Sequence, residues 1–206
     1  MGLNSDLFFQ YVVAGITYGT IYAVVAIGFN IIYNATGIIN FAQGEFVMLG
    51  GMTAVTLSRF LPLPVAILGA VAVTTVIGAV IEILFIRWLR GPSVLRMIII
   101  TIGVSILVRE VALHVWGESI RALPYFTGTS VTSIKMGNVY ISPQVLWVVG
   151  VSAVAVAALI AFFNYTMLGR QMRACAANRD AARLCGVNTG NMVTLSFMVS
   201  AAIGAL

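Results

Sequence analysis

Six apolar runs fill most of the sequence, and the short polar gaps between them carry most of its arginines. The runs cover residues 7–33, 41–57, 65–86, 97–116, 144–167 and 192–206. A helix needs about 20 apolar residues to cross the hydrocarbon core of a bilayer. Only 8% of the residues are charged, against about 25% in soluble domains, so the chain cannot cover a water-facing surface. The sequence therefore predicts an all-α, polytopic transmembrane helical bundle.

The 206 residues are interpreted as one transmembrane domain with about five full spans. The last run is shorter than a full span, and we expect it to be a sixth span that is truncated at its C-terminal side. A break is predicted over 34–40, where asparagine and glycine weaken the first helix. Two runs carry small residues at the spacing of close helix contacts. These residues are Gly15 and Gly19 in the first run, and Ala153, Ala157 and Ala161 in the fifth.

The arginine-rich gaps predict the topology. Residues 87–96 contain three arginines and residues 169–191 contain four, whereas 117–143 holds only Arg121 and Lys135 as cations. Cytoplasmic loops of membrane proteins are enriched in such residues. We therefore expect both arginine-rich loops in the cytoplasm and 117–143 outside, where its composition suggests extended structure or a short hairpin. The N-terminus would also be outside if the second run crosses the membrane fully.

A polar cluster stands inside the apolar context of the second run. Asn40, Gln43 and Glu45 surround Gly44, and a carboxylate facing lipid at this depth costs at least about 2.5 kcal/mol. Broken helices with freed backbone groups form substrate sites in transporters, so these four residues are a candidate substrate path. The alternative is structural, with Asn40 capping a helix and Glu45 bonded to a neighbouring helix.

Three further ionisable residues lie within or near the runs. Glu82 is close enough to Arg87 to reach the cytoplasmic interface, and Glu110 and His114 share a helix face because they are four residues apart. An ion pair near the outer end of the fourth run is the favoured interpretation of Glu110 and His114. The single histidine and the lack of HExxH exclude a recognisable metal site, and no catalytic pair is evident.

The segment 169–191 predicts a short helix. Asn178 suits the N-cap, Asp180 has the favourable sign for the first turn, and Gly186 suits the position after the C-terminus. Two functions remain open for this basic, alanine-rich helix. It either lies on a membrane surface, held by anionic lipid, or docks into a cytosolic partner.

The segments 15–33 (GITYGTIYAVVAIGFNIIY), 36–46 (TGIINFAQGEF) and 48–51 (MLGG) resemble the permeases of branched-chain amino acid ABC importers, most closely the LivH-type subunit. The resemblance continues through 168–174 (LGRQMRA) and 182–188 (ARLCGVN). It implies that 169–191 is a cytoplasmic ATPase-coupling loop. The coupling residues that it implies are Arg173, Asp180, Ala181, Ala182 and Gly186.

The resemblance also implies partners: a second permease subunit, two cytosolic ABC ATPases and an extracytoplasmic substrate-binding protein, in a bacterial or archaeal inner membrane, with membrane lipid around them. The chain has no GxxxxGK[ST] phosphate-binding loop, so energy must come from another subunit and the chain is not expected to be an enzyme. No cofactor and no nucleic acid are expected. Urea and short-amide permeases of the same superfamily are the alternative; a secondary transporter should show an internal repeat, and none is evident.

Overall fold

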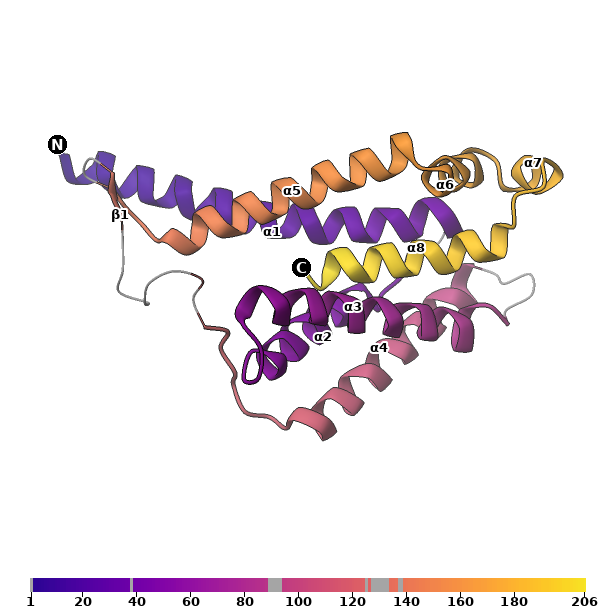
Figure 1. The fold of residues 1–206 in the computed structure, drawn as a ribbon, viewed down its shortest axis with the longest axis horizontal. Helices are drawn as coiled ribbons and strands as arrows, with labels where there is room; N and C mark the ends of the chain where they lie inside the picture. Colours follow the sequence, from indigo (N-terminus) through magenta and orange to yellow (C-terminus); the bar gives the residue numbers. More distant parts are fainter. Residues whose placement is uncertain (1, 38, 89–93, 125, 127–133, 137–138) are drawn as a thin grey trace.

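The chain folds into a bundle of long helices, which confirms the all-α, polytopic prediction (Figure 1). The computed structural model describes residues 2–37, 39–88, 94–124, 126, 134–136 and 139–206. The centre of the first arginine-rich loop, 89–93, and residues 127–133 of the predicted outer segment lie outside the described residues. In chain order the elements are α1 (Gly2–Thr36), α2 (Gln43–Leu57), α3 (Leu63–Ile81), the π-helical turn η1 (Glu82–Ile86), α4 (Val94–Trp116), β1 (Ile134–Met136), β2 (Val139–Ile141), α5 (Pro143–Tyr165), α6 (Met167–Ala177), α7 (Arg179–Leu184) and α8 (Thr189–Gly204).

Four helices within the described part of the chain are long and apolar enough to cross a bilayer. They are Leu7–Thr36, Leu63–Ile86, Leu95–Trp116 and Pro143–Tyr165. The second apolar run, predicted to be a full span, forms the 15-residue helix α2, because the break after α1 takes up its first residues. The predicted hairpin is present, since β1 and β2 pair antiparallel with Ile134 opposite Ile141.

Side-chain caps set the starts of the later helices. The Thr166 hydroxyl accepts from the Gly169 amide at 3.0 Å and begins α6, which sequence analysis did not separate from the loop. The Asn188 side chain accepts from the Asn191 amide at 3.2 Å and begins α8. Each cap satisfies one backbone donor that a helix start leaves unpaired.

The last helix, α8, occupies the centre of the bundle and packs against α1, α2 and α3 (Figure 1). Its approach to α3 depends on Gly78, because a Cβ at this position would lie 2.6 Å from the Ala201 Cβ. Gly50 permits the same kind of close approach between α2 and the end of α8 at Ala205. A C-terminal run shorter than a full span therefore supplies much of the core.

Within the described residues, the small residues that were predicted to form close helix contacts on α1 and α5 do not form them. A Cβ added to Gly15 or Gly19 would meet nothing within 4 Å, and Ala153, Ala157 and Ala161 are exposed. The buried stripe of small residues instead lies on α3. Its members, four residues apart, are Ala66, Ala70, Thr74 and Gly78.

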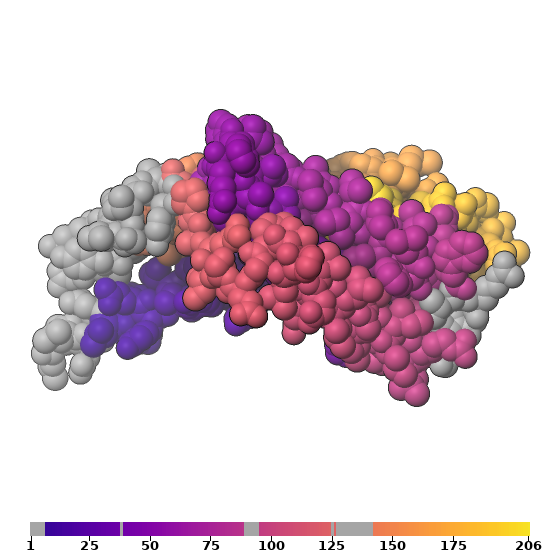
Figure 2. Space-filling view, turned by 90° about the horizontal axis from the view of Figure 1, so that it is seen from below, coloured from indigo at the N-terminus to yellow at the C-terminus, as the bar shows by residue number. Residues whose placement is uncertain are grey.

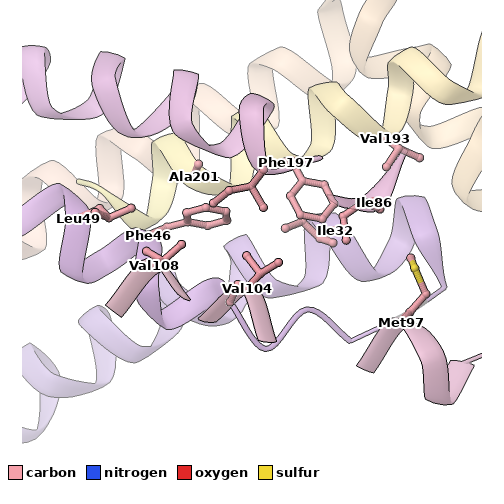
Figure 3. Packing of buried hydrophobic residues seen from close by; sticks show 12 residues of the cluster. Ile32, Phe46, Leu49, Ile86, Met97, Val104, Val108, Val193, Phe197 and Ala201 are labelled. Carbon is pink, nitrogen blue, oxygen red and sulfur yellow. The ribbon is translucent and has the colours of Figure 1, made fainter. Parts of the chain in front are cut away.

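An aromatic pair anchors the main hydrophobic core (Figure 3). Phe46 of α2 lies between Leu49 and residues of α4, and Phe197 of α8 lies beside Ile32 of α1. Phe46 and Phe197 are almost fully buried. Burial of such side chains stabilises by about 1.5–3 kcal/mol each relative to exposure to water. The members of this core come from α1, α2, α3, η1, α4 and α8.

Helix α4 lies along the outer surface of the bundle, where no other described segment covers it in the view of Figure 2. Trp116 at its end donates from Nε1 to the Thr56 hydroxyl at 2.8 Å, which ties α4 to α2. On the opposite side α5 packs against α1 and continues into α6.

Segments that the charge pattern assigns to opposite sides of the membrane lie at opposite ends of the bundle. The N-terminus and β1 lie at one end, and α6 and α7 lie at the other (Figure 1). Arg87 donates from Nη2 to Asn191 Oδ1 at 3.1 Å, so the two arginine-rich loops are adjacent. Their common location on the cytoplasmic side stays a prediction.

Candidate functional site

The chain break between α1 and α2 positions the candidate substrate-path residues. Gly37 ends α1 with a φ of +73°, a conformation that glycine adopts without steric cost. Asn40 then folds back, and its Oδ1 accepts from the Ala42 amide at 3.1 Å. This bond forms a turn just ahead of α2. The N-cap of α2 is Ala42 and has no side-chain cap hydrogen bond, so the structural alternative in which Asn40 caps the helix is not borne out.

Asn40 is nevertheless incompletely bonded. Its residue is 2% exposed, and its Nδ2 has no hydrogen-bond partner in the structure. A buried amide donor without a partner costs about 1–3 kcal/mol. Asn40 Nδ2 is therefore an unused hydrogen-bond donor beside the break.

Gln43 connects the break to the central helix. The Ser200 hydroxyl lies 2.6 Å from Gln43 Oε1 and 2.6 Å from the Gly28 carbonyl oxygen, and its one proton is donated to one acceptor at a time. Gln43 Nε2 donates to the Ser200 carbonyl oxygen at 3.4 Å. A side chain at Gly28 would occupy the space that the Gln43 amide fills. Gln43 therefore joins α1, α2 and α8.

Glu45 connects α2 to the outer helix α4. Its Oε1 accepts from the Ser105 hydroxyl at 2.7 Å and from Arg109 Nη2 at 3.0 Å. The Glu45 side chain is 6% exposed, whereas that of Arg109 is 63% exposed. A buried carboxylate needs such partners, and this bonding to a neighbouring helix matches the structural alternative for Glu45. Gly44 lies on the exposed side of α2.

Sequence reasoning missed the partners of these residues. Ser105, Arg109 and Ser200 are far from the cluster in sequence, and only an unpaired charge at Arg109 could have indicated one of them. Glu82 was expected at the interface but is buried, and it accepts from the Thr194 hydroxyl at 2.6 Å. Glu110 and His114 are exposed on α4 and do not form the predicted ion pair.

The predicted coupling segment forms two helices. Asn178 Oδ1 accepts from the Ala181 amide at 3.0 Å and begins α7, and Gly186 follows with a φ of +85°, which confirms the predicted short helix and its caps. Asp180 and Ala181 are exposed. Leu184, which sequence analysis did not single out, is 90% exposed.

Two other residues of the predicted coupling set contact the rest of the chain. Ala182 is 5% exposed and packs in a cluster with Met172, Cys175 and Met192, so it supports the packing of α7 against the chain. Arg173 is on α6, where its Nη1 donates to Asn164 Oδ1 of α5 at 3.2 Å. It therefore joins α6 to the end of α5.

The described residues define a helical membrane protein whose buried polar side chains tie its helices together. Among these residues no three His, Cys, Asp or Glu side chains gather as a metal site would require. Comparison with known proteins shows which family this membrane protein belongs to.

Residues 11–206 match the family described as the permease component of branched-chain amino acid transport systems. The chain is 33% identical over 97% of its length to the high-affinity branched-chain amino acid transport system permease protein BraD of Pseudomonas aeruginosa, and covers 69% of that protein. It is 30% identical over 97% of its length to the permease proteins named LivH of Salmonella typhimurium and Escherichia coli, and covers 68% of each. No solved structure matches. The chain belongs to this permease family, so it is a membrane-embedded transport component of a multi-component system and not itself an enzyme.

Proposed function

We propose that this chain is the membrane-spanning subunit of an ATP-binding-cassette importer that carries branched-chain amino acids into the cytoplasm. The family match over residues 11–206 is the observation that carries the proposal. Relatives named for branched-chain amino acid transport, such as BraD, support the substrate class. The four long apolar helices support a multi-pass location, which we assign to the inner membrane of a bacterium or archaeon.

The proposed assembly has a second, related permease, two cytosolic ATPases and an extracytoplasmic substrate-binding protein. The absence of a phosphate-binding loop from the sequence supports a separate ATPase. Substrate would arrive from the binding protein at the end of the bundle that holds β1, and leave at the end that holds α6 and α7.

The α6–α7 segment, within residues 169–191, is the proposed ATPase-coupling element. Leu184 supports this role because a fully exposed leucine on a polar, capped helix is suited to fill an apolar groove of a partner. The exposed Asp180 and Ala181 flank the same surface. Motion of α7 would pass through the Gly186 turn into α8, and the contact between Arg173 and Asn164 would pass it to α5.

Asn40, Gln43, Gly44 and Glu45 are the proposed path element. The buried residues at the start of α2 support this proposal, because the positive end of the helix dipole there favours an anionic group such as a substrate carboxylate. The unpaired Asn40 Nδ2 adds a donor, and the exposed Gly44 leaves the backbone approachable. Gln43 and Glu45 brace this element against α8 and α4.

Uptake into proteoliposomes tests the proposal. The chain is reconstituted with its cognate permease, ATPases and binding protein, and radiolabelled leucine is followed with and without ATP. We expect uptake that needs ATP and the binding protein, and that excess isoleucine or valine suppresses. Suppression by urea or acetamide instead would assign the chain to the short-amide alternative. Uptake that follows an ion gradient without ATP would contradict the importer.

A further inference from the structure

A cavity of about 470 Å³ lies between the end of α1, the end of α5 and the helix α6. It is separate from the Asn40–Glu45 cluster. Its polar lining comes from Asn30, Asn34 and Arg173, and its apolar lining includes Ile27, Ile31 and Phe163. None of the lining residues is acidic. The cavity thus presents one cation and two amides beside a hydrocarbon wall.

The cavity lies near the end of a helix that is long enough to span the bilayer. Asn34 precedes the end of α1 by two residues and Asn30 by six, so at 1.5 Å per residue they are about 3 Å and 9 Å from that end. Tyr33 and Tyr165 are exposed at the same ends of α1 and α5. Exposed tyrosines mark the interface between membrane and water.

The exposed amides need a polar neighbour. Asn30 and Asn34 are four residues apart, so they face the same side of α1, and both are exposed in a helix long enough to span the bilayer. Polar side chains inside a membrane avoid the acyl chains and bond to another polar group. Arg173 carries five N–H donors, of which Asn164 accepts one.

We propose that this cavity binds an acidic phospholipid, with the phosphate on Arg173, Asn30 and Asn34 and the first part of an acyl chain against Ile27, Ile31 and Phe163. Guanidinium groups bind phosphate with charge-assisted hydrogen bonds, and the amides donate to phosphate or headgroup oxygens. The apolar wall favours a lipid over free phosphate, because inorganic phosphate would leave that wall uncovered. Basic pockets between spanning helices commonly hold acidic headgroups.

Lipid titration of the purified full chain tests this site. Phosphatidylglycerol and phosphatidylcholine are added separately to the detergent-solubilised protein, and bound lipid is counted by native mass spectrometry. We expect saturable binding of phosphatidylglycerol and none of comparable affinity for phosphatidylcholine. Arg173→Gln should weaken phosphatidylglycerol binding about fivefold, the factor for loss of one cation at an anionic surface. Ala26→Phe, which fills the cavity without removing charge, should weaken it as well.

Arg183→Gln is the matched control, because it removes the same charge from α7 outside the cavity. Its phosphatidylglycerol affinity should equal that of the unaltered chain. Equal losses in Arg173→Gln and Arg183→Gln, or equal binding of the two lipids, would overturn the proposal. Complete displacement of the lipid by equimolar inorganic phosphate would show a simple anion site and overturn it too. If Arg173→Gln fails to fold, Asn34→Ala, which removes one of the proposed phosphate donors from the lining, should weaken phosphatidylglycerol binding while Arg183→Gln leaves it unchanged.

Discussion

Glu45 shows how one buried side chain holds two helices. Its carboxylate receives Ser105 and Arg109 from α4 while it remains almost fully buried. We expect Glu45→Gln to destabilise the solubilised protein by roughly 1–3 kcal/mol, because Ser105 and Arg109 would then donate to a neutral amide oxygen in place of a carboxylate in a buried site. Leucine uptake should fall as well. Thermal unfolding of the variant in detergent, compared with that of the unaltered protein, checks the predicted loss of stability.

Arg109 supplies the second half of this test. Its side chain is 63% exposed, so solvent or a neighbouring chain screens the pair, and we expect a coupling of roughly 0.2–1 kcal/mol in a double-mutant cycle of Glu45→Gln and Arg109→Gln. Arg109→Gln alone should therefore cost less than Glu45→Gln. Equal costs with no further loss in the double variant would contradict the assignment of Ser105 as a significant partner.

At the scale of helices, glycine sets the contact between α3 and α8. Gly78→Ala should destabilise the protein by roughly 1–3 kcal/mol, because the added methyl group meets Ala201 at 2.6 Å and the Phe197 carbonyl oxygen at 3.0 Å. Gly103→Ala on α4 is the control, since its Cβ would meet nothing within 4 Å. That variant should be at least as stable as the unaltered protein, because alanine favours a helix more than glycine does. Similar losses in both variants would contradict the close α3–α8 contact.

The helix α7 gives the second prediction at this scale. Leu184→Asp should abolish copurification of the ATPase while the permease stays folded and inserted, because the 90% exposed leucine makes few contacts within the chain. Leu184→Ala should weaken copurification less. Ala182→Arg is unsuitable for this purpose, since Ala182 is buried and the substitution would unfold α7. Wild-type ATPase retention by Leu184→Asp would leave a lipid-surface role for α7.

For the whole molecule, two native cysteines report which side of the membrane α6 and α7 occupy. Cys185 is exposed and Cys175 is buried. Burial raises the pKa of the Cys175 thiol, and the nearby Arg179 charge lowers it by less, so near neutral pH Cys175 holds less of the reactive thiolate than an unperturbed cysteine. A membrane-impermeant maleimide should label Cys185 in inside-out vesicles and not in intact cells.

Cys175 should label slowly at neutral pH, and faster as the pH rises toward its raised pKa. The variant Cys185→Ser leaves Cys175 as the only cysteine, so it measures the labelling of Cys175 alone. It should lose most of the maleimide labelling at neutral pH. Strong labelling of Cys185 in intact cells would place α7 outside and contradict the predicted topology.

The sequence by itself determined the class, four of its predicted spans and several helix ends. Apolar runs in a chain with so few charges have one stable environment, so the helical bundle follows from composition and length. Local bonds made the α7 helix predictable, because the Asn178 cap and the Gly186 turn depend on residues three or fewer positions from the helix. The position of the break near Asn40 followed in the same way.

Tertiary structure alone decided which surfaces meet. Small residues at helix-contact spacing occur on α1, α3 and α5, yet within the described residues only the α3 stripe is buried. Glu45 received a partner 64 residues away, and Gln43 one 157 residues away. Lipid and protein are almost equally apolar to these helices, so hydrophobicity does not select the contact face. Shape complementarity and the pairing of buried polar groups select it, and both depend on residues that only the fold brings together.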